Sequence, residues 1–106
     1  MKSPKAAKLL RIYMNENDRS RGKPLYVALT LFLKSKDVRS VTVLRGRMGF
    51  GRGGIIHGNH FWPTPGDFSI ILECLDQAER IEAVLPEIIH MLTHGTCVVI
   101  DGQIWE

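Results

Sequence analysis

A segment of ten residues, RGRMGFGRGG from Arg45 to Gly54, combines residue types that bind phosphate in proteins. It packs five glycines and three arginines directly after the apolar run VTVL. Glycine lets an anion approach the backbone N–H groups closely, and each arginine guanidinium supplies a forked pair of donors. The segment is therefore a candidate anion-binding loop.

Two well-known phosphate motifs do not fit the chain. Gly49, Gly51 and Gly54 satisfy the spacing G-x-G-x-x-G, but the dinucleotide fingerprint also needs a helix that begins at the loop, and IIHGNHFWPTPG follows instead. The segment RSRGKP is not a P-loop, because Pro24 replaces the Ser or Thr that would bind magnesium. A glycine-rich hairpin with solvated arginines remains the alternative to an anion site.

The composition is that of one globular domain. The 106 residues are 44% hydrophobic and 24% charged, with a formal net charge of +3. We expect a single domain over residues 1–106. No apolar run reaches the roughly 18 residues of a membrane span. We therefore expect no membrane span and a cytoplasmic location.

Hydrophobic periodicity predicts four strands, at residues 9–14, 41–45, 67–75 and 96–105. A first helix is expected at residues 24–36, with Pro24 in its first turn. A second helix is expected to open with Asp76 and Glu79 as a capping pair, to kink or break at Pro86 and to end at Gly95. The connection over residues 48–66 contains six glycines and is typical of a long loop.

The order β-α-β-β-α-β predicts an α+β, ferredoxin-like fold, with a four-stranded antiparallel sheet and two helices on one face. The strands at 9–14, 67–75 and 96–105 carry apolar residues at both alternating positions. Two helices can cover only one face of the sheet, and an exposed apolar face is unusual on a monomer. We therefore predict that the chain forms a homo-oligomer that covers the second face. Cys74 and Cys97 would lie on strands that flank the first strand, too far apart for a disulfide.

Three segments, KLLRIYMNENDRSRGKPLYVALT, VTVLRGRMGFG and IEAVLPEI, together resemble the family of PII-like proteins known as domain of unknown function 190. The resemblance covers residues 8–104. It implies a ferredoxin-like homotrimer similar to the PII signalling proteins. Some relatives in this family are associated with adenine nucleotides.

PII proteins carry a similar Gly-Phe-Gly-Arg run at the start of their long loop, where it lines a nucleotide cleft between subunits. The resemblance implies a regulatory protein that binds AMP, ADP or ATP in such a cleft and signals to a protein partner through the loop at residues 48–66. The expected nucleotide-binding residues are Arg45, Arg47, Gly49, Phe50, Gly51 and Arg52. The chain departs from PII proteins in lacking the tyrosine that some of them have modified and the lysine-bearing phosphate loop before the last strand. Its segment GGIIHGNHFWPTPG also differs, so the PII partner cannot be transferred.

Three other functions fit the sequence less well. RNA or single-stranded nucleic acid is not expected as a partner, because MGFGRGG precedes the third strand instead of lying on it as in RNA-recognition domains. A metal-binding trimer would use the pairs His90 with His94 and His57 with His60, but neither pair has a third ligand nearby, and no required cofactor is expected. No nucleophile and base are recognisable, so we expect no enzyme and assign no catalytic residue.

Overall fold

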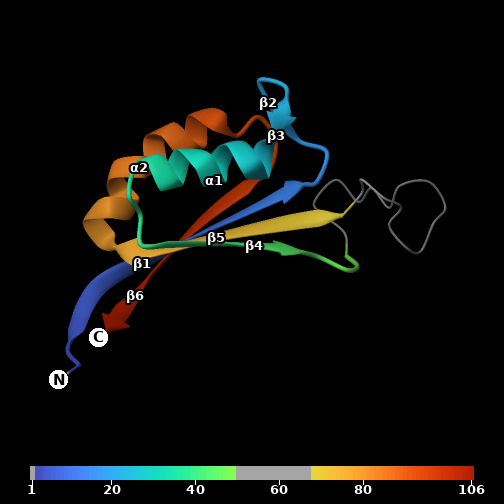
Figure 1. Cartoon of the computed structure of the whole chain (residues 1–106). Helices are drawn as coiled ribbons and strands as arrows, with labels where there is room; N and C mark the ends of the chain where they lie inside the picture. The colour runs from blue at the N-terminus through green and yellow to red at the C-terminus, as the bar shows by residue number, and fades with distance from the viewer. Residues whose placement is uncertain (1, 50–67) are drawn as a thin grey trace.

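A computed structural model describes residues 2–49 and 68–106 of the chain (Figure 1). The elements in order are β1 (Pro4–Asn15), β2 (Arg19–Ser20), β3 (Lys23–Pro24), α1 (Leu25–Ser35), β4 (Ser40–Arg45), β5 (Ser69–Gln77), α2 (Ala78–Met91) and β6 (Thr96–Trp105). One antiparallel sheet has the order β4-β5-β1-β6, and both helices lie on the same face of it (Figure 1). The predicted ferredoxin-like architecture is confirmed. Neither described helix is long and apolar enough to cross a membrane.

The central strand β1 is longer than its apolar run predicts. It begins at Pro4 rather than at residue 9, because β6 pairs with it from Pro4 to Tyr13 while β5 pairs with it from Ala7 to Asn15. Ser3 and Glu106 exchange two backbone hydrogen bonds beyond the strand ends, with N···O distances of 3.2 and 3.4 Å. The two ends of the chain therefore lie side by side (Figure 1).

The helix-covered face of the sheet holds the core. On α1 the buried residues Leu25, Leu29 and Leu33 recur every fourth residue and form one stripe. The core consists of these leucines, of Ile81, Val84 and Ile88 from α2, and of Leu10, Ile12, Met14, Ile70, Leu72 and Cys74 from the sheet. Packing against the helices thus explains why every second residue of the central strands is apolar and buried on this face.

The other face of the sheet is apolar and not covered by either helix. The register places Leu9 between Leu75 and Ile100, and Tyr13 next to Ile71. Side chains on this face are partly exposed: Tyr13 39%, Leu44 46%, Leu75 36%, Val98 36% and Ile100 44%. We call this surface the open face. It consists of these five side chains, of Leu9 and Ile71, and of the ion pair between Arg11 and Glu73 at its centre. The expected split of apolar residues between two faces is confirmed; a trimer stays a prediction.

Two local predictions for the helix starts are wrong, and one hairpin was not predicted. Pro24 does not lie in the first helical turn: it ends β3 and is the N-cap of α1, with an extended ψ of 133°. The polar segment before it contains the β2–β3 hairpin, which was not predicted because its residues show no alternation of apolar and polar types. Asp76 does not cap α2, because it belongs to β5 and the cap residue is Gln77, without a side-chain cap bond.

The second helix also ends earlier than predicted. It continues through Pro86 as one element to Met91, so the helix does not break at the proline. Gly95 lies beyond the helix, with φ at +111° and its backbone close to β1. A Cβ atom at this position would be 2.6 Å from the carbonyl oxygen of Tyr13, which accounts for glycine there better than a helix cap does.

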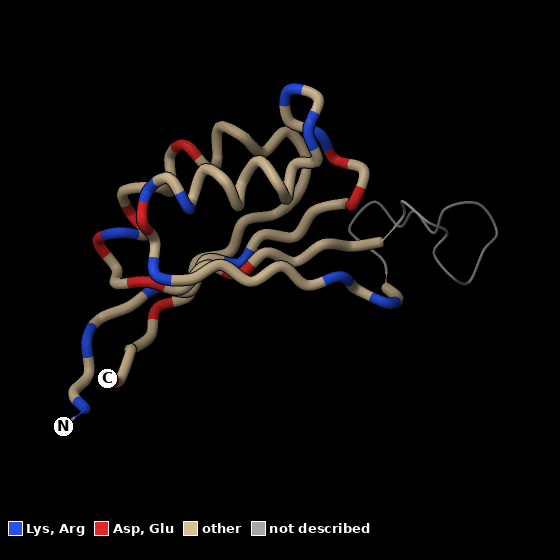
Figure 2. The backbone as a smooth tube through the Cα atoms, viewed as in Figure 1, with Lys and Arg blue, Asp and Glu red and all other residues tan. Residues whose placement is uncertain are grey.

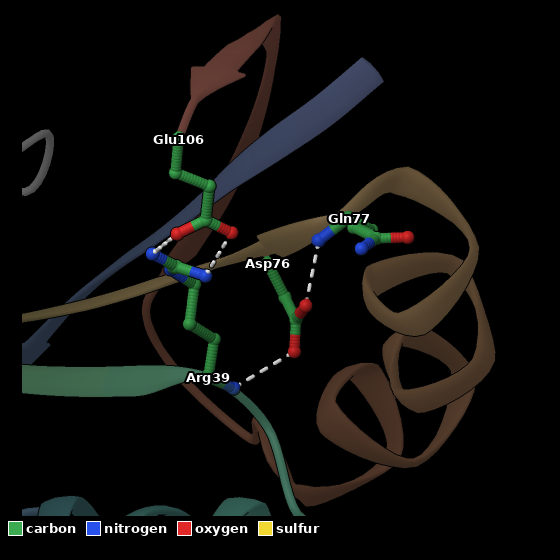
Figure 3. A network of polar contacts seen from close by, with 4 residues as sticks. All are labelled: Arg39, Asp76, Gln77 and Glu106. Carbon is green, nitrogen blue, oxygen red and sulfur yellow. Dashed lines mark hydrogen bonds and ion pairs between the residues drawn. The ribbon is translucent and has the colours of Figure 1, made fainter. Parts of the chain in front are cut away.

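The start of β4 is fixed by a polar network (Figure 3). The buried carboxylate of Asp76 accepts hydrogen bonds from the backbone N–H of Arg39 at 2.8 Å and of Gln77 at 2.7 Å. The Arg39 guanidinium forms two hydrogen bonds with the Glu106 carboxylate, one of them 2.7 Å long. Asp76 therefore ties the chain just before Ser40 to the end of β5.

Candidate functional site

The Gly/Arg segment follows the far end of β4. The strand ends at Arg45, as the sequence predicted, and one further backbone bond joins the N–H of Gly46 to the carbonyl of Ser69 at 2.8 Å. This bond holds the start of the segment against β5. The two strands therefore position both ends of the connection over residues 46–68.

Arg45 is bonded within the chain. Its guanidinium carbon lies 3.8 Å from the ring centroid of Phe68, and its Nη2 is 3.3 Å from Oε2 of Glu16. The backbone N–H of Glu16 in turn donates to the carbonyl of Phe68 at 2.9 Å. Because this arginine already has an anionic partner, a phosphate that bound to it would compete with the Glu16 carboxylate.

The remaining expected residues are only partly within the described chain. Arg47 and Gly49 are exposed, and neither belongs to a strand. Phe50, Gly51 and Arg52 lie outside the described residues, as does the rest of the expected loop up to residue 66. The structure thus places Arg45, Arg47 and Gly49 after one another at the same end of the sheet, and their contacts with a ligand stay a prediction.

Glu16 and Phe68 were not recognisable as neighbours of Arg45 from the sequence. Glu16 is separated from Arg45 by 29 positions, and its place near Arg19 and Arg21 in the sequence suggests a solvated loop charge. Phe68 precedes β5 and carries no motif of its own. Only the antiparallel pairing of β1, β4 and β5 brings the three residues together.

The described cysteines are free and lie on opposite sides of β1. Cys74 is opposite Leu10 and Cys97 is opposite Ile12, as the predicted strand order requires. Burial raises the pKa of the Cys74 thiol to about 11, and burial also raises the pKa of Cys97. Both thiols are therefore protonated near neutral pH and packed with the core rather than activated.

The described histidines lie at the end of α2. His90 is in the helix and His94 follows it, and both are exposed. Within residues 2–49 and 68–106, no three side chains of His, Cys, Asp or Glu are grouped closely enough to hold a metal ion. His57 and His60 lie outside these ranges. On the open face the described part of the chain presents one aromatic side chain, Tyr13, rather than the set that stacks RNA bases.

Comparison with known proteins agrees with this architecture. A UPF0166 protein of Methanocaldococcus jannaschii, MJ1524, is 30% identical over 101 residues, which cover 94% of this chain and 93% of that protein. A UPF0166 protein of Aquifex aeolicus is 31% identical over 81 residues, covering 76% and 77% of the two chains.

A similar fold occurs in the crystal structure of a "putative PII-like signaling protein" (TTHA0516) from Thermus thermophilus. The TM-score is 0.60 at 17% identity, over 97% of this chain and 91% of that one, which shows a shared PII-like fold. Residues 7–104 match the family DUF190, described as "Uncharacterized ACR, COG1993". The chain therefore belongs to the DUF190 family.

Proposed function

We propose that this protein is a PII-like regulator that binds an adenine nucleotide in a cleft between subunits of a homotrimer. The observation that carries the proposal is the position of the Gly/Arg segment, which leaves a PII-like sheet at Arg45 and is held to β5 through Gly46. Glycine N–H groups and arginine guanidinium groups suit phosphate. The nucleotide residues are Arg45, Arg47, Gly49, Phe50, Gly51 and Arg52.

The open face supports the trimer in this proposal. Five of its apolar side chains are between 36% and 46% exposed, on a sheet whose other face is already covered by α1 and α2. A second and third copy would bury these side chains, and apolar burial contributes about 25 cal/mol per Å². Nucleotide binding between subunits would then depend on the open face as well as on the Gly/Arg segment.

Signalling would pass through the loop at residues 48–66. The residues that flank this loop, Arg45 before it and Phe68 after it, contact each other, and both contact Glu16. If a phosphate takes the Arg45 guanidinium from Glu16, ligand binding changes the contacts at both ends of the loop. A protein partner that contacts the loop would sense this change.

A panel of nucleotides tests the proposal. AMP, ADP, ATP and cyclic nucleotides at millimolar concentration are added to the purified protein, and its melting temperature and binding heat are measured. A nucleotide at 100 times its dissociation constant stabilises the protein by about 2.7 kcal/mol per site. For a domain of this size the melting temperature then rises on the order of 10 °C. No shift and no heat with any member of the panel would refute nucleotide binding.

Charge variants locate the phosphate contacts. Arg47→Gln and Arg52→Gln should each weaken nucleotide binding without changing the melting temperature of the ligand-free protein. Glu16→Gln should strengthen binding, because it removes the carboxylate that competes for Arg45. Arg19→Gln, on the β2–β3 hairpin, removes the same charge elsewhere and serves as the control. If all four variants bind equally well, the nucleotide lies at another site.

A further inference from the structure

A depression of about 430 Å³ lies where the β2–β3 hairpin meets the two helices. Its walls come from three elements: the β2–β3 hairpin, α1 and the second half of α2. The hairpin lies beside the ends of both helices (Figure 1). The volume is in the range of small-molecule sites in proteins. Arg45, Arg47 and Gly49 are not among the residues that line this depression.

We call the apolar lining residues of the depression, Leu31, Phe32 and Met91, its floor, and we call its charged lining residues the rim. Leu31 is 50% exposed although it lies in the middle of α1. The fully buried stripe of this helix is a different one, Leu25, Leu29 and Leu33, whereas Phe32 and Met91 are partly buried against the core. The floor therefore offers apolar surface that the folded chain buries only in part, chiefly at Leu31.

The rim is cationic. Arg21 and Lys23 supply its positive charge from the hairpin, where Figure 2 shows lysine and arginine alternating with other residues. Among the described residues, neither Arg21 nor Lys23 forms an ion pair or donates a side-chain hydrogen bond. Glu87 is the one carboxylate of the lining. The rim can thus supply two cations that have no anionic partner in this part of the chain.

The hairpin turn holds Arg21 in an unfavourable backbone conformation. Arg21 and Gly22 have φ values of +49° and +81° between the paired residues Ser20 and Lys23, which is a two-residue turn of type I′. Asn followed by Gly is the preferred sequence for this turn, because Asn tolerates positive φ better than Arg. An arginine here costs stability, so its side chain is better explained by a role at the rim than by the turn.

We propose that this depression binds a small amphipathic anion, in which an aromatic or alkyl body rests on Leu31, Phe32 and Met91 while a carboxylate or phosphate group pairs with Arg21 and Lys23. The anion fits because the apolar floor and the cationic rim lie within one depression. A neutral apolar molecule would leave the cations unpaired. A purely ionic one would leave the floor exposed to water.

Amide NMR spectra of the 15N-labelled chain test the proposal with three matched probes: 2-naphthoate, 2-naphthyl phosphate and the neutral 2-naphthamide. At least one of the two anions should shift resonances of the β2–β3 hairpin and of the facing turns of α1 and α2. The neutral amide should bind at least about tenfold more weakly, the usual effect of losing a hydrogen bond between charged groups. Whichever anion binds more tightly identifies the head group. Equal binding of all three probes, or shifts confined to the open face, would overturn the proposal.

Variants of the hairpin separate binding from folding. Arg21→Asn should weaken binding of the anion about tenfold, because it removes a charged hydrogen-bond donor. The melting temperature should stay equal or rise, because the substitution creates the preferred Asn-Gly turn. Lys23→Gln should weaken binding of the anion by a similar factor, and Glu87→Gln should strengthen it by removing the carboxylate of the lining. Arg19→Gln removes a charge from the same hairpin but not from the lining, and should change nothing. If Arg19→Gln weakens binding as much as Arg21→Asn does, the anion senses only the general positive charge and the site is refuted.

Discussion

On the central strand, Leu9 and Leu10 are neighbours in sequence but lie in opposite surroundings. Leu10 is fully buried beneath the helices, and Leu9 is partly exposed on the open face between Leu75 and Ile100. The same alternation holds on β5, where Ile70 is buried and Ile71 is not. Both faces have the composition of a core, but the chain provides helices for one of them only.

The two faces differ in what each needs: the first is covered by the chain's own helices, and the second is the surface that we propose other copies cover. The helix-covered face explains why the domain folds. The open face, with apolar side chains around the Arg11–Glu73 ion pair, has more exposed apolar surface than a folded monomer needs. The guanidinium and carboxylate already satisfy one another there, so covering this face would not leave either charge without a partner.

The largest expected effect distinguishes the two leucines. Leu10→Ala should lower the free energy of unfolding by about 2–5 kcal/mol, because it leaves a cavity in the core. Leu9→Ala should lower it clearly less when the protein is dilute. Urea denaturation at two protein concentrations measures both losses, and the loss for Leu9→Ala should grow with concentration. Equal losses for the two variants at low concentration would contradict the distinction between the faces.

A charge on the open face tests its role in assembly. Ile100→Glu should convert the proposed trimer to monomers of 12.0 kDa, because a carboxylate cannot be buried there without a partner. Ile89→Glu is the matched control: Ile89 is 56% exposed, against 44% for Ile100, and lies on the outer surface of α2. Light scattering gives the mass and circular dichroism checks the fold. A wild-type protein that is already monomeric at micromolar concentration would refute the trimer.

Polar groups allow a similar comparison between buried and exposed positions. Asp76 is 5% exposed and accepts two backbone hydrogen bonds, from Arg39 and Gln77. Asp76→Asn removes the charge and turns an amide N–H₂ group toward one of these donors, which should lower the free energy of unfolding by about 1.5–3 kcal/mol. Urea denaturation measures the loss, and amide exchange should be fastest near Arg39. A loss no larger than that of an exposed carboxylate would mean that Asp76 does not fix β4.

The smallest effect is expected at the exposed end of the same network. Hydrogen bonding to Arg39 lowers the pKa of Glu106 below its ordinary value. The pair therefore stabilises the fold at neutral pH, and this contribution is lost as the pH falls below the ordinary pKa of a glutamate and through the lowered pKa of Glu106. Glu106→Gln should melt slightly below the wild type at pH 7, and the difference should vanish at low pH and shrink with salt. A difference that grows on acidification would have the wrong sign.

Much of the fold could be predicted from local patterns, whereas little of the candidate site could. The strand at residues 96–105 coincides with β6, and the one at 41–45 is nearly β4, because alternating and β-branched residues mark them locally. The β2–β3 hairpin was missed because Arg21-Gly22 is an uncommon pair for a type I′ turn. Asp76 resembled a helix cap because its spacing to Glu79 is that of a capping box, but the carboxylate turns toward the N–H of Arg39 instead.

The sequence by itself determined the order of strands and helices, the excess of apolar positions over what two helices can cover, and the Gly/Arg segment as the candidate anion loop. These features depend on residues close together in the chain. Only the tertiary structure decided that Arg45 contacts Glu16 and Phe68, and that the cations of the β2–β3 hairpin lie beside the apolar surface of α1. The reason is physical: such contacts join distant segments, and their geometry depends on strand register and helix packing, which no local spacing specifies.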